Sequence, residues 1–454
     1  MPGFSEDVWK RLVEHIFVAK EFTPDMLSAP EVRSAIDETC RILTHGVDSA
    51  IKRQVPQELI DHLHNDTFLF SGFKTYHTAR EISAMLLDPE TGSFKNFDKF
   101  FNEVRSIDER YNHAYLKAEY NFAVQSTQMA VKWHDFEQDG DRYLLQYRTA
   151  NDGNVRPEHQ ALHNTTLPIG DPFWNDYTPP LGWNCRCTVV QVRRDKYPES
   201  DSATAIRAGE AATAKPKQRI FRFNPGKTER VFPPKHPYLP KGCGDCQYRK
   251  QRRLGYNPDN PMCQACEALA KCMKDATIEE HRKAFDELVA SGKYTDLEFN
   301  PQTGAYKATH LEHNFDTEKG KFNIERGEYE KIARDALFDK GSTVVLVKED
   351  PSIGVKQPDG ILNGRIMDIK GVEGNPMWAI NRACGQKAEV CVLYFHDPAS
   401  FSEDDVRKKF CVDLPEWRNK TDYISEKQMS VNTVVCVVNG NGSYDIREIK
   451  KPEN

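Results

Sequence analysis

The sequence predicts a multidomain α+β protein with a mainly helical N-terminal region, a small cysteine-rich module and a C-terminal α/β domain. Three observations carry this expectation. Apolar residues recur at helical spacing through the first 145 residues or so, two CxxC pairs stand between 243 and 266, and strand-sized apolar runs follow a helical segment after about 300. A chain of 454 residues exceeds one ordinary core, so two or three domains are expected.

Composition narrows the classes of protein. The formal charge of −6 gives no global attraction to nucleic acid, so any such contact must be local. The N-terminus has no basic segment followed by an apolar run, and the longest apolar runs, such as Val390 to Phe395, are strand-sized; we therefore expect neither a secretory signal nor a membrane segment. Twelve cysteines without an export signal favour a reducing compartment and a metal site over a disulfide scaffold.

The predicted domain boundaries follow changes in composition and hydrophobic periodicity along the chain. Helical periodicity ends near 145, and Gly, Pro, Asn, His and Trp then cluster before a predicted strand at 188–192. The next stretch is polar and rich in Ala, Lys and Pro. We expect a first domain over 1–192, an arm or linker over 193–240, a cysteine module with a helix over 241–300, and a last domain over 301–454.

Three separated pieces of the first domain carry a family resemblance. They read NDTFLFSGFKTYHTAREI, YNHAYLKAEYNFAVQSTQMAVKW and a third piece containing Arg156, Pro157, His159, Pro180 and the run Asn184-Cys185-Arg186-Cys187. Residues 1–192 resemble the phage Mu F-type head morphogenesis family. The resemblance implies a minor capsid protein inside the virion, with portal and capsid proteins as partners, and entry into the bacterial host cytoplasm with the DNA.

Two interpretations of the signature residues remain open. His159 and His163 share one face if the segment is helical, and Cys185 and Cys187 share one face if theirs is extended. Two His and two Cys could hold a tetrahedral zinc ion. The alternative is a network of buried polar residues that fixes an irregular fold, and the unusual CxC spacing favours this alternative.

The cysteine module has the spacing of a structural zinc site. Cys243 and Cys246 form one CxxC pair, Cys263 and Cys266 form the second, and sixteen residues separate them. Thiolates suit Zn²⁺, and so short a segment could not bury a core without a metal. Free buried cysteines are the alternative, and Cys272 is a possible substitute ligand.

The last domain contains a predicted β-hairpin that concentrates charge. Asn363-Gly364 is a strong two-residue turn signal, so 362 should face 365 and Asp359 should face Asp368. Directly opposed side chains on one face lie about 4.5–5.5 Å apart. Lys370 should share that face, while Leu362, Met367 and Ile369 should anchor the other.

Two opposed aspartates and an amine suit phosphodiester hydrolysis. A divalent cation such as Mg²⁺, Mn²⁺ or Zn²⁺ between Asp359 and Asp368 would remove their repulsion and activate water. The Lys370 ammonium could stabilise the charge that develops on the phosphate. The alternative is a surface hairpin with ordinary solvated charges.

The segment from about 310 to 450 resembles PD-(D/E)xK nucleases, with their restriction-endonuclease-like fold. More narrowly, it is similar to the tRNA-cleaving toxin domains of contact-dependent growth inhibition. The resemblance implies catalytic roles for Glu328 on the helix before the hairpin and for Gln386 after it, tRNA or other RNA as substrate, and a cognate immunity protein as a further partner. Arg365, Arg382 and Lys387 are candidate contacts to nucleic acid.

Three functions fit these features. The first is a minor capsid protein carrying a nuclease toxin effector. The second is a purely structural head protein whose C-terminal domain is an inactive nuclease. The third is a phage DNase, because RNA and DNA offer the same phosphodiester to the Asp359, Asp368 and Lys370 triad.

Overall fold

The computed structural model describes residues 1–240, 260–348, 357–420, 430–440 and 443–451. It forms two compact units, Met1–Cys272 and Met273–Asn454. Among the helices described, none is long and apolar enough to cross a membrane.

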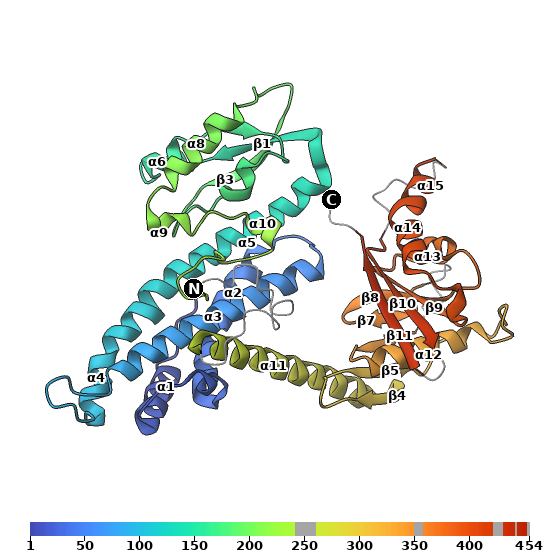
Figure 1. The fold of residues 1–454 in the computed structure, drawn as a ribbon, viewed down its shortest axis with the longest axis horizontal. Coiled ribbons are helices and arrows are strands. Elements are labelled where there is room, and N and C mark those ends of the chain that lie inside the picture. The colour runs from blue at the N-terminus through green and yellow to red at the C-terminus, as the bar shows by residue number, and fades with distance from the viewer. Residues whose placement is uncertain (241–259, 349–356, 421–429, 441–442, 452–454) are drawn as a thin grey trace. The chain divides into compact units, whose positions relative to one another are not determined.

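The first unit is built on helices (Figure 1). Ser5 caps the first of them by accepting a hydrogen bond from the Val8 amide, and Pro30 opens the second. The long helices share one core, to which Trp9, Phe70 and Phe122 contribute. The elements are α1 (Glu6–Ala19), η1 (Pro24–Ser28), α2 (Pro30–Ala50), α3 (Gln57–Ala84), α4 (Phe97–Asp108), η2 (Glu109–Tyr115), α5 (Leu116–Asp139) and η3 (Gly140–Arg142).

A small antiparallel sheet follows these helices, with strand order β2-β1-β3. Its strands are β1 (Tyr143–Arg148), β2 (Thr166–Leu167) and β3 (Thr188–Arg193). The chain between β1 and β3 is largely irregular and carries only β2 and two one-turn helices, α6 (Pro157–Gln160) and α7 (Phe173–Asp176). Trp133, Trp174 and Leu181 are buried in the core beneath the sheet.

The expectation of an arm or linker over 193–240 is wrong. This stretch forms α8 (Ser202–Ala212), α9 (Pro216–Arg219) and α10 (Pro225–Thr228), and it packs against the rest of the unit. Phe232 is fully buried and stacks on Phe70 with ring centroids 3.7 Å apart. The apolar residues were too widely spaced along this polar sequence to show a helical pattern, yet burial of their side chains fixes the segment.

The second unit contains a mixed eight-stranded sheet of order β11-β10-β9-β8-β7-β6-β5-β4. Strands β8, β9 and β10 run parallel to one another. The strands are β4 (Tyr294–Phe299), β5 (Tyr306–His310), β6 (Val344–Leu346), β7 (Gly360–Leu362), β8 (Arg365–Gly371), β9 (Val390–Phe395), β10 (Thr433–Gly440) and β11 (Ser443–Lys450). Since β4 joins this sheet, the domain begins before the expected residue 301.

Helices cover both faces of this sheet (Figure 1). Alternate residues of β9 point to opposite faces, so Val392 packs with Tyr329 and Leu337 of α12 (Arg326–Asp339), while Leu393 packs with Ile380 of α13 (Pro376–Gly385). The layer on the α13 side of the sheet also contains η5 (Pro398–Ser400), α14 (Glu403–Lys408), η6 (Lys409–Asp413) and α15 (Leu414–Lys420).

In the cysteine module expected over 241–300, the helix α11 (Pro261–Ser291) begins before the second CxxC pair. It takes in both Cys263 and Cys266. Ala265 and Leu269 pack into the core of the first unit. Burial of these small and aliphatic side chains explains why the helix begins earlier.

Candidate active site

The predicted hairpin is confirmed. Asn363 and Gly364 both adopt positive φ, at 49° and 78°, as a tight two-residue hairpin turn requires. Leu362 pairs with Arg365, and Gly360 pairs with Met367. The next step outward brings Asp359 opposite Asp368, so the turn sets the register of both carboxylates.

The two aspartates and Lys370 come together as the sequence predicts. The Nζ of Lys370 lies 2.6 Å from Oδ1 of Asp368 and 3.6 Å from Oδ2 of Asp359. The Ile369 amide donates a hydrogen bond of 2.7 Å to Oδ2 of Asp359. All three charged side chains are buried, Asp368 completely. Beneath them Leu362, Met367 and Ile369 anchor the opposite face, as expected.

Burial and mutual repulsion dominate the electrostatics of the pair. Burial, with the neighbouring Asp359 charge, raises the pKa of Asp368 to about 8, although Lys370 acts in the other direction. Burial lowers the pKa of Lys370, but the two aspartates outweigh it and the net shift is upward. The site therefore keeps a cationic amine beside carboxylates that are short of counter-charge.

The structure places Glu330, and not the predicted Glu328, on the side of α12 that faces the aspartates. Glu328 is half exposed and forms an ion pair with Lys331 at 3.4 Å. Two residues along an α-helix turn the side chain by about 200°, so Glu328 and Glu330 point in nearly opposite directions. Glu330 is buried and interacts electrostatically with Asp359 and Lys370. Helical periodicity could have predicted this from the sequence, because Glu330 lies on the same face of the helix as the buried Ala333 and Leu337.

His313 is a further residue at this site that sequence reasoning missed. Its Nε2 lies 2.9 Å from Oε2 of Glu330, and its Nδ1 lies 2.6 Å from the carbonyl oxygen of Val347. A carbonyl only accepts, so Nδ1 carries a proton. Burial lowers the pKa of His313, but its bonds to Glu330 and Val347 raise it overall. The three carboxylates Asp359, Asp368 and Glu330 do not all approach within 4.8 Å of one another.

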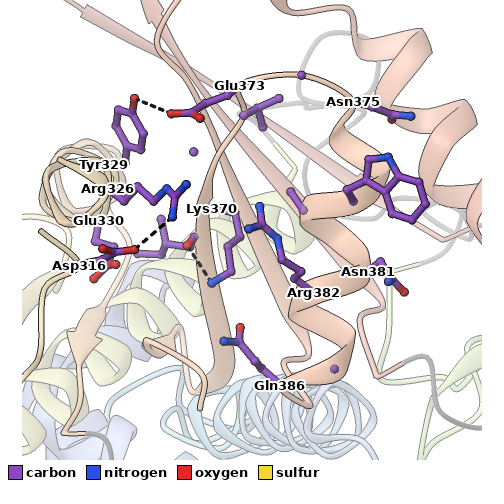
Figure 2. Close-up of a pocket in the computed structure, with 17 residues that line it drawn as sticks. Asp316, Arg326, Tyr329, Glu330, Lys370, Glu373, Asn375, Asn381, Arg382 and Gln386 are labelled. Atoms are coloured by element: carbon purple, nitrogen blue, oxygen red, sulfur yellow. Dashed lines mark hydrogen bonds and ion pairs between the residues drawn. The ribbon is translucent and has the colours of Figure 1, made fainter. Parts of the chain in front are cut away.

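A pocket of about 680 Å³ borders the site, lined by residues of α12, β8 and α13. Figure 2 shows Lys370 between Glu330 of α12 on one side and, on the other, Arg382 of α13 and Gln386, which follows that helix. Asp359 and Asp368 are not among the lining residues, so Lys370 and Glu330 connect the pocket to the aspartate pair. A partly open pocket with polar groups beside charged residues is a common setting for ligand binding.

Of the remaining predicted site residues, some line the pocket and others do not. Gln386 follows α13 as expected, and its buried Oε1 has no hydrogen-bond partner within the described part of the chain. Arg382 also lines the pocket. Lys387 does not line it, and neither does Arg365, which bonds to Asn432 and, at 2.9 Å, to the Thr433 hydroxyl. The structure therefore joins only Arg382 of the three cations to this pocket.

The cysteine module is described only in part. Cys243 and Cys246 lie outside the described residues, whereas Cys263 and Cys266 lie half-buried in the first turns of α11. Three residues apart on a helix, these two share one face. Cys272 is buried elsewhere, with its sulfur 3.7 Å from the Leu27 carbonyl. The four-cysteine zinc site stays a prediction.

The signature of the first unit gathers around α6. His159 lies against Cys185 and Cys187. The Arg156 guanidinium donates to the Trp183 carbonyl at 2.8 Å, which ties α6 to the chain just before these cysteines. His163 turns elsewhere, with its Nδ1 2.9 Å from the Thr149 hydroxyl. A site using both histidines is therefore not formed.

Comparison with known proteins bears on this signature region. Residues 90–190 match the family model for Phage Mu protein F like protein. The chain is 39% identical over 71 residues to the "Putative capsid assembly protein F" of Escherichia phage Mu, covering 15% of this chain and 16% of that protein. It is 39% identical over 62 residues to the Mu-like prophage FluMu F protein of Haemophilus influenzae, covering 12% and 15%. No solved structure matches the chain.

The match is narrower than the expected 1–192 and takes in none of the second unit. The chain spans about one-sixth of the length of these curated relatives. Residues 90–190 include α5, β1, β2, the first residues of β3 and the cluster of His159 with the two cysteines. The first unit therefore contains a Phage Mu F-like domain.

Proposed function

We propose that this chain is a phage minor head protein whose C-terminal unit is a metal-dependent nuclease that cleaves tRNA or another RNA. The head-protein half rests on the Mu F-like domain and on the role in capsid assembly that the name of its phage Mu relative states. Its partners are then portal and capsid proteins, and its location is the virion interior before delivery to the bacterial cytoplasm.

The nuclease half rests on one observation: the hairpin brings Asp359 and Asp368 into contact with Lys370, which lines a pocket. The donor set fits a hard divalent cation such as Mg²⁺ or Mn²⁺, because Asp359 and Asp368 offer carboxylate oxygens with Glu330 nearby. Such an ion would activate a water molecule and neutralise the scissile phosphate. Zn²⁺ is also compatible with carboxylate ligands.

The protein groups around the aspartates have complementary roles. Lys370 reaches both aspartates and lines the pocket, so its ammonium can stabilise negative charge on a phosphate bound there. His313 holds Glu330 in place through its second hydrogen bond to Val347. Arg382 of α13 and Gln386, just after this helix, can position the substrate. The toxin resemblance implies that the substrate is RNA rather than DNA, and that an immunity protein blocks the pocket.

A structural role for the C-terminal unit is the second candidate, and one observation favours it. Asp368 is fully buried and Lys370 closes on it at 2.6 Å, so an amine of the protein already gives this carboxylate a counter-charge. The contact of Lys370 with Asp359 across the hairpin, at 3.6 Å, can simply hold its two strands together. A phage DNase shares the geometry of the first proposal and differs only in substrate.

Induced expression of the full chain in bacteria separates these functions. We expect the wild type to arrest growth and the Asp359→Asn variant to be harmless at equal protein level. Sequencing of RNA ends and inspection of the chromosome identify the substrate, and purified chain with Mg²⁺, Mn²⁺ or Zn²⁺, against a chelator control, identifies the metal. If neither form is toxic and no metal supports cleavage of RNA or DNA, the structural role holds.

A further inference from the structure

A buried His–Cys–Cys group lies in the Mu F-like domain of the first unit. The Nδ1 of His159 is 3.6 Å from the sulfur of Cys185 and 3.8 Å from the sulfur of Cys187. All three ligand atoms lie within 4.8 Å of one another, which within the described ranges is true of no other group of three or more His, Cys, Asp or Glu. His159 and Cys185 are almost fully buried, and Cys187 is half-buried.

These distances are those of ligands around a tetrahedral ion. Zinc bonds to sulfur at about 2.3 Å and to imidazole nitrogen at about 2.0–2.1 Å, which at tetrahedral angles separates nitrogen from sulfur by about 3.6 Å. Both measured separations are close to that value. The ligand set of one imidazole and two thiols also suits Zn²⁺ better than the hard cations Mg²⁺ or Ca²⁺.

A fourth position is available beside the group. A small cavity of about 20 Å³ borders His159, Cys185 and Cys187, with Asn154, Arg156 and Asn184 among its other neighbours. A cavity needs roughly 10–15 Å³ to hold one water molecule. One water in this polar cavity could complete a tetrahedral site with three protein ligands.

The positions of His159, Cys185 and Cys187 in the chain suggest that a bound ion has a structural role. His159 lies in the one-turn helix α6, and the two cysteines lie immediately before β3. Between them the chain is largely irregular, so few backbone ladders fix it. An ion bound by His159 at one end of this segment and by the two cysteines at the other would cross-link the two ends. Its binding energy would then stabilise the fold.

We propose that His159, Cys185 and Cys187 bind one Zn²⁺ ion, with water as the fourth ligand, and that the ion fixes the irregular segment between β1 and β3. His163, the other histidine of the signature, is not a ligand because it bonds to Thr149. The competing explanations are a metal-free network of imidazole–thiol hydrogen bonds and a disulfide between Cys185 and Cys187. The proposal is independent of the nuclease function.

Metal content of the purified full chain tests the site. We expect His159→Gln and the double variant C185S/C187S each to contain one equivalent of zinc less than wild type by elemental analysis. His163→Gln is the matched control and should keep the wild-type content. Any zinc at the four-cysteine module is common to all four proteins, so it does not affect the difference. Equal content in all four proteins would overturn the proposal.

Cobalt replacement gives a readout that does not depend on the folding of one variant. Co²⁺ added to reduced, metal-stripped protein should give sulfur-to-cobalt charge-transfer absorption that C185S/C187S lacks in part. His159→Cys keeps a ligand at the position, so it should bind the ion and show stronger charge transfer than wild type. An unchanged spectrum in C185S/C187S, or a Cys185–Cys187 disulfide found by mass spectrometry in freshly purified protein, would contradict the assignment.

Discussion

The side-chain nitrogen of Lys370 lies 2.6 Å from a carboxylate oxygen of Asp368, two residues earlier on the same strand. Neighbouring side chains two apart share one face of a strand, and the hairpin brings Asp359 to that face from the next strand. Lys370 is therefore the counter-charge for both aspartates and a lining residue of the adjoining pocket. The predictions for the second unit follow from this arrangement.

Replacing Glu330 by Gln should abolish most nuclease activity, whereas Glu328→Gln should retain it. Glu330 is buried and interacts with Asp359 and Lys370, while Glu328 pairs at the surface with Lys331. We expect at least a hundredfold loss of cleavage rate for the first variant and less than twofold for the second. Rates on a defined RNA measure both. Equal rates for the two variants would remove Glu330 from the site.

Stability of the metal-free second unit should fall as pH rises from about 4 to about 8. The folded pKa of Asp368 is about 8, whereas its ordinary value is 3.8, so in this window the folded state binds more protons than the unfolded state. One proton changes the free energy of unfolding by at most about 1.4 kcal/mol per pH unit.

Asp368→Asn should flatten that dependence, because the amide does not titrate. Urea unfolding of residues 273–454 in chelator at several pH values measures the slope. Asp445→Asn is the control, since Asp445 forms an exposed pair with Arg447. A wild-type slope in the Asp368→Asn protein would show that this carboxyl is ionised throughout.

His313 and Glu330 should be energetically coupled. Their 2.9 Å contact is buried, and hydrogen bonds to charged groups contribute about 1.5–3 kcal/mol. A double-mutant cycle with His313→Gln and Glu330→Gln measures the coupling free energy directly. Because the folded pKa of His313 is raised, the coupling should be full below its ordinary value of 6.5 and decline as pH rises through the folded pKa. Additive effects at pH 6 would contradict the pairing.

Gln386→Ala should impair cleavage without destabilising the fold. The Gln386 Oε1 is buried at the pocket and has no hydrogen-bond partner among the described residues, so removing it breaks no such bond of that atom. If the side chain bonds to substrate, its loss should lower kcat/KM about tenfold, the equivalent of one hydrogen bond. Lys387→Ala, next in the chain but outside the pocket lining, should leave kcat/KM unchanged. A decrease for Lys387 alone would reverse the assignment.

Phe232→Ala should destabilise the first unit by about 3–5 kcal/mol, as for other fully buried aromatic residues. Phe232 belongs to the stretch that stacks on Phe70 of α3, so the variant tests whether 193–240 is integral to the fold. Thermal unfolding of the full chain measures the effect. Phe94→Ala, at a half-exposed position, is the control and should change little. A small effect at Phe232 would restore the picture of a loosely attached arm.

Several features of the fold and the site depend on local residue chemistry and could be predicted from the sequence. The Asn363-Gly364 turn admits positive φ at both residues, which fixes the hairpin register and with it the meeting of Asp359, Asp368 and Lys370. Helical periodicity predicted the long helices of the first unit, and the signature around His159 marked the region that matches the Mu F-like family.

Contacts between distant segments determine which neighbours these residues meet. The tertiary structure selected Glu330 over Glu328, added His313, separated His163 from His159, and buried the stretch from 193 to 240 in the first unit. The physical reason is that these choices depend on packing between segments far apart in the chain. Local propensity fixes the direction of a side chain along its own element, whereas the facing element determines its partner.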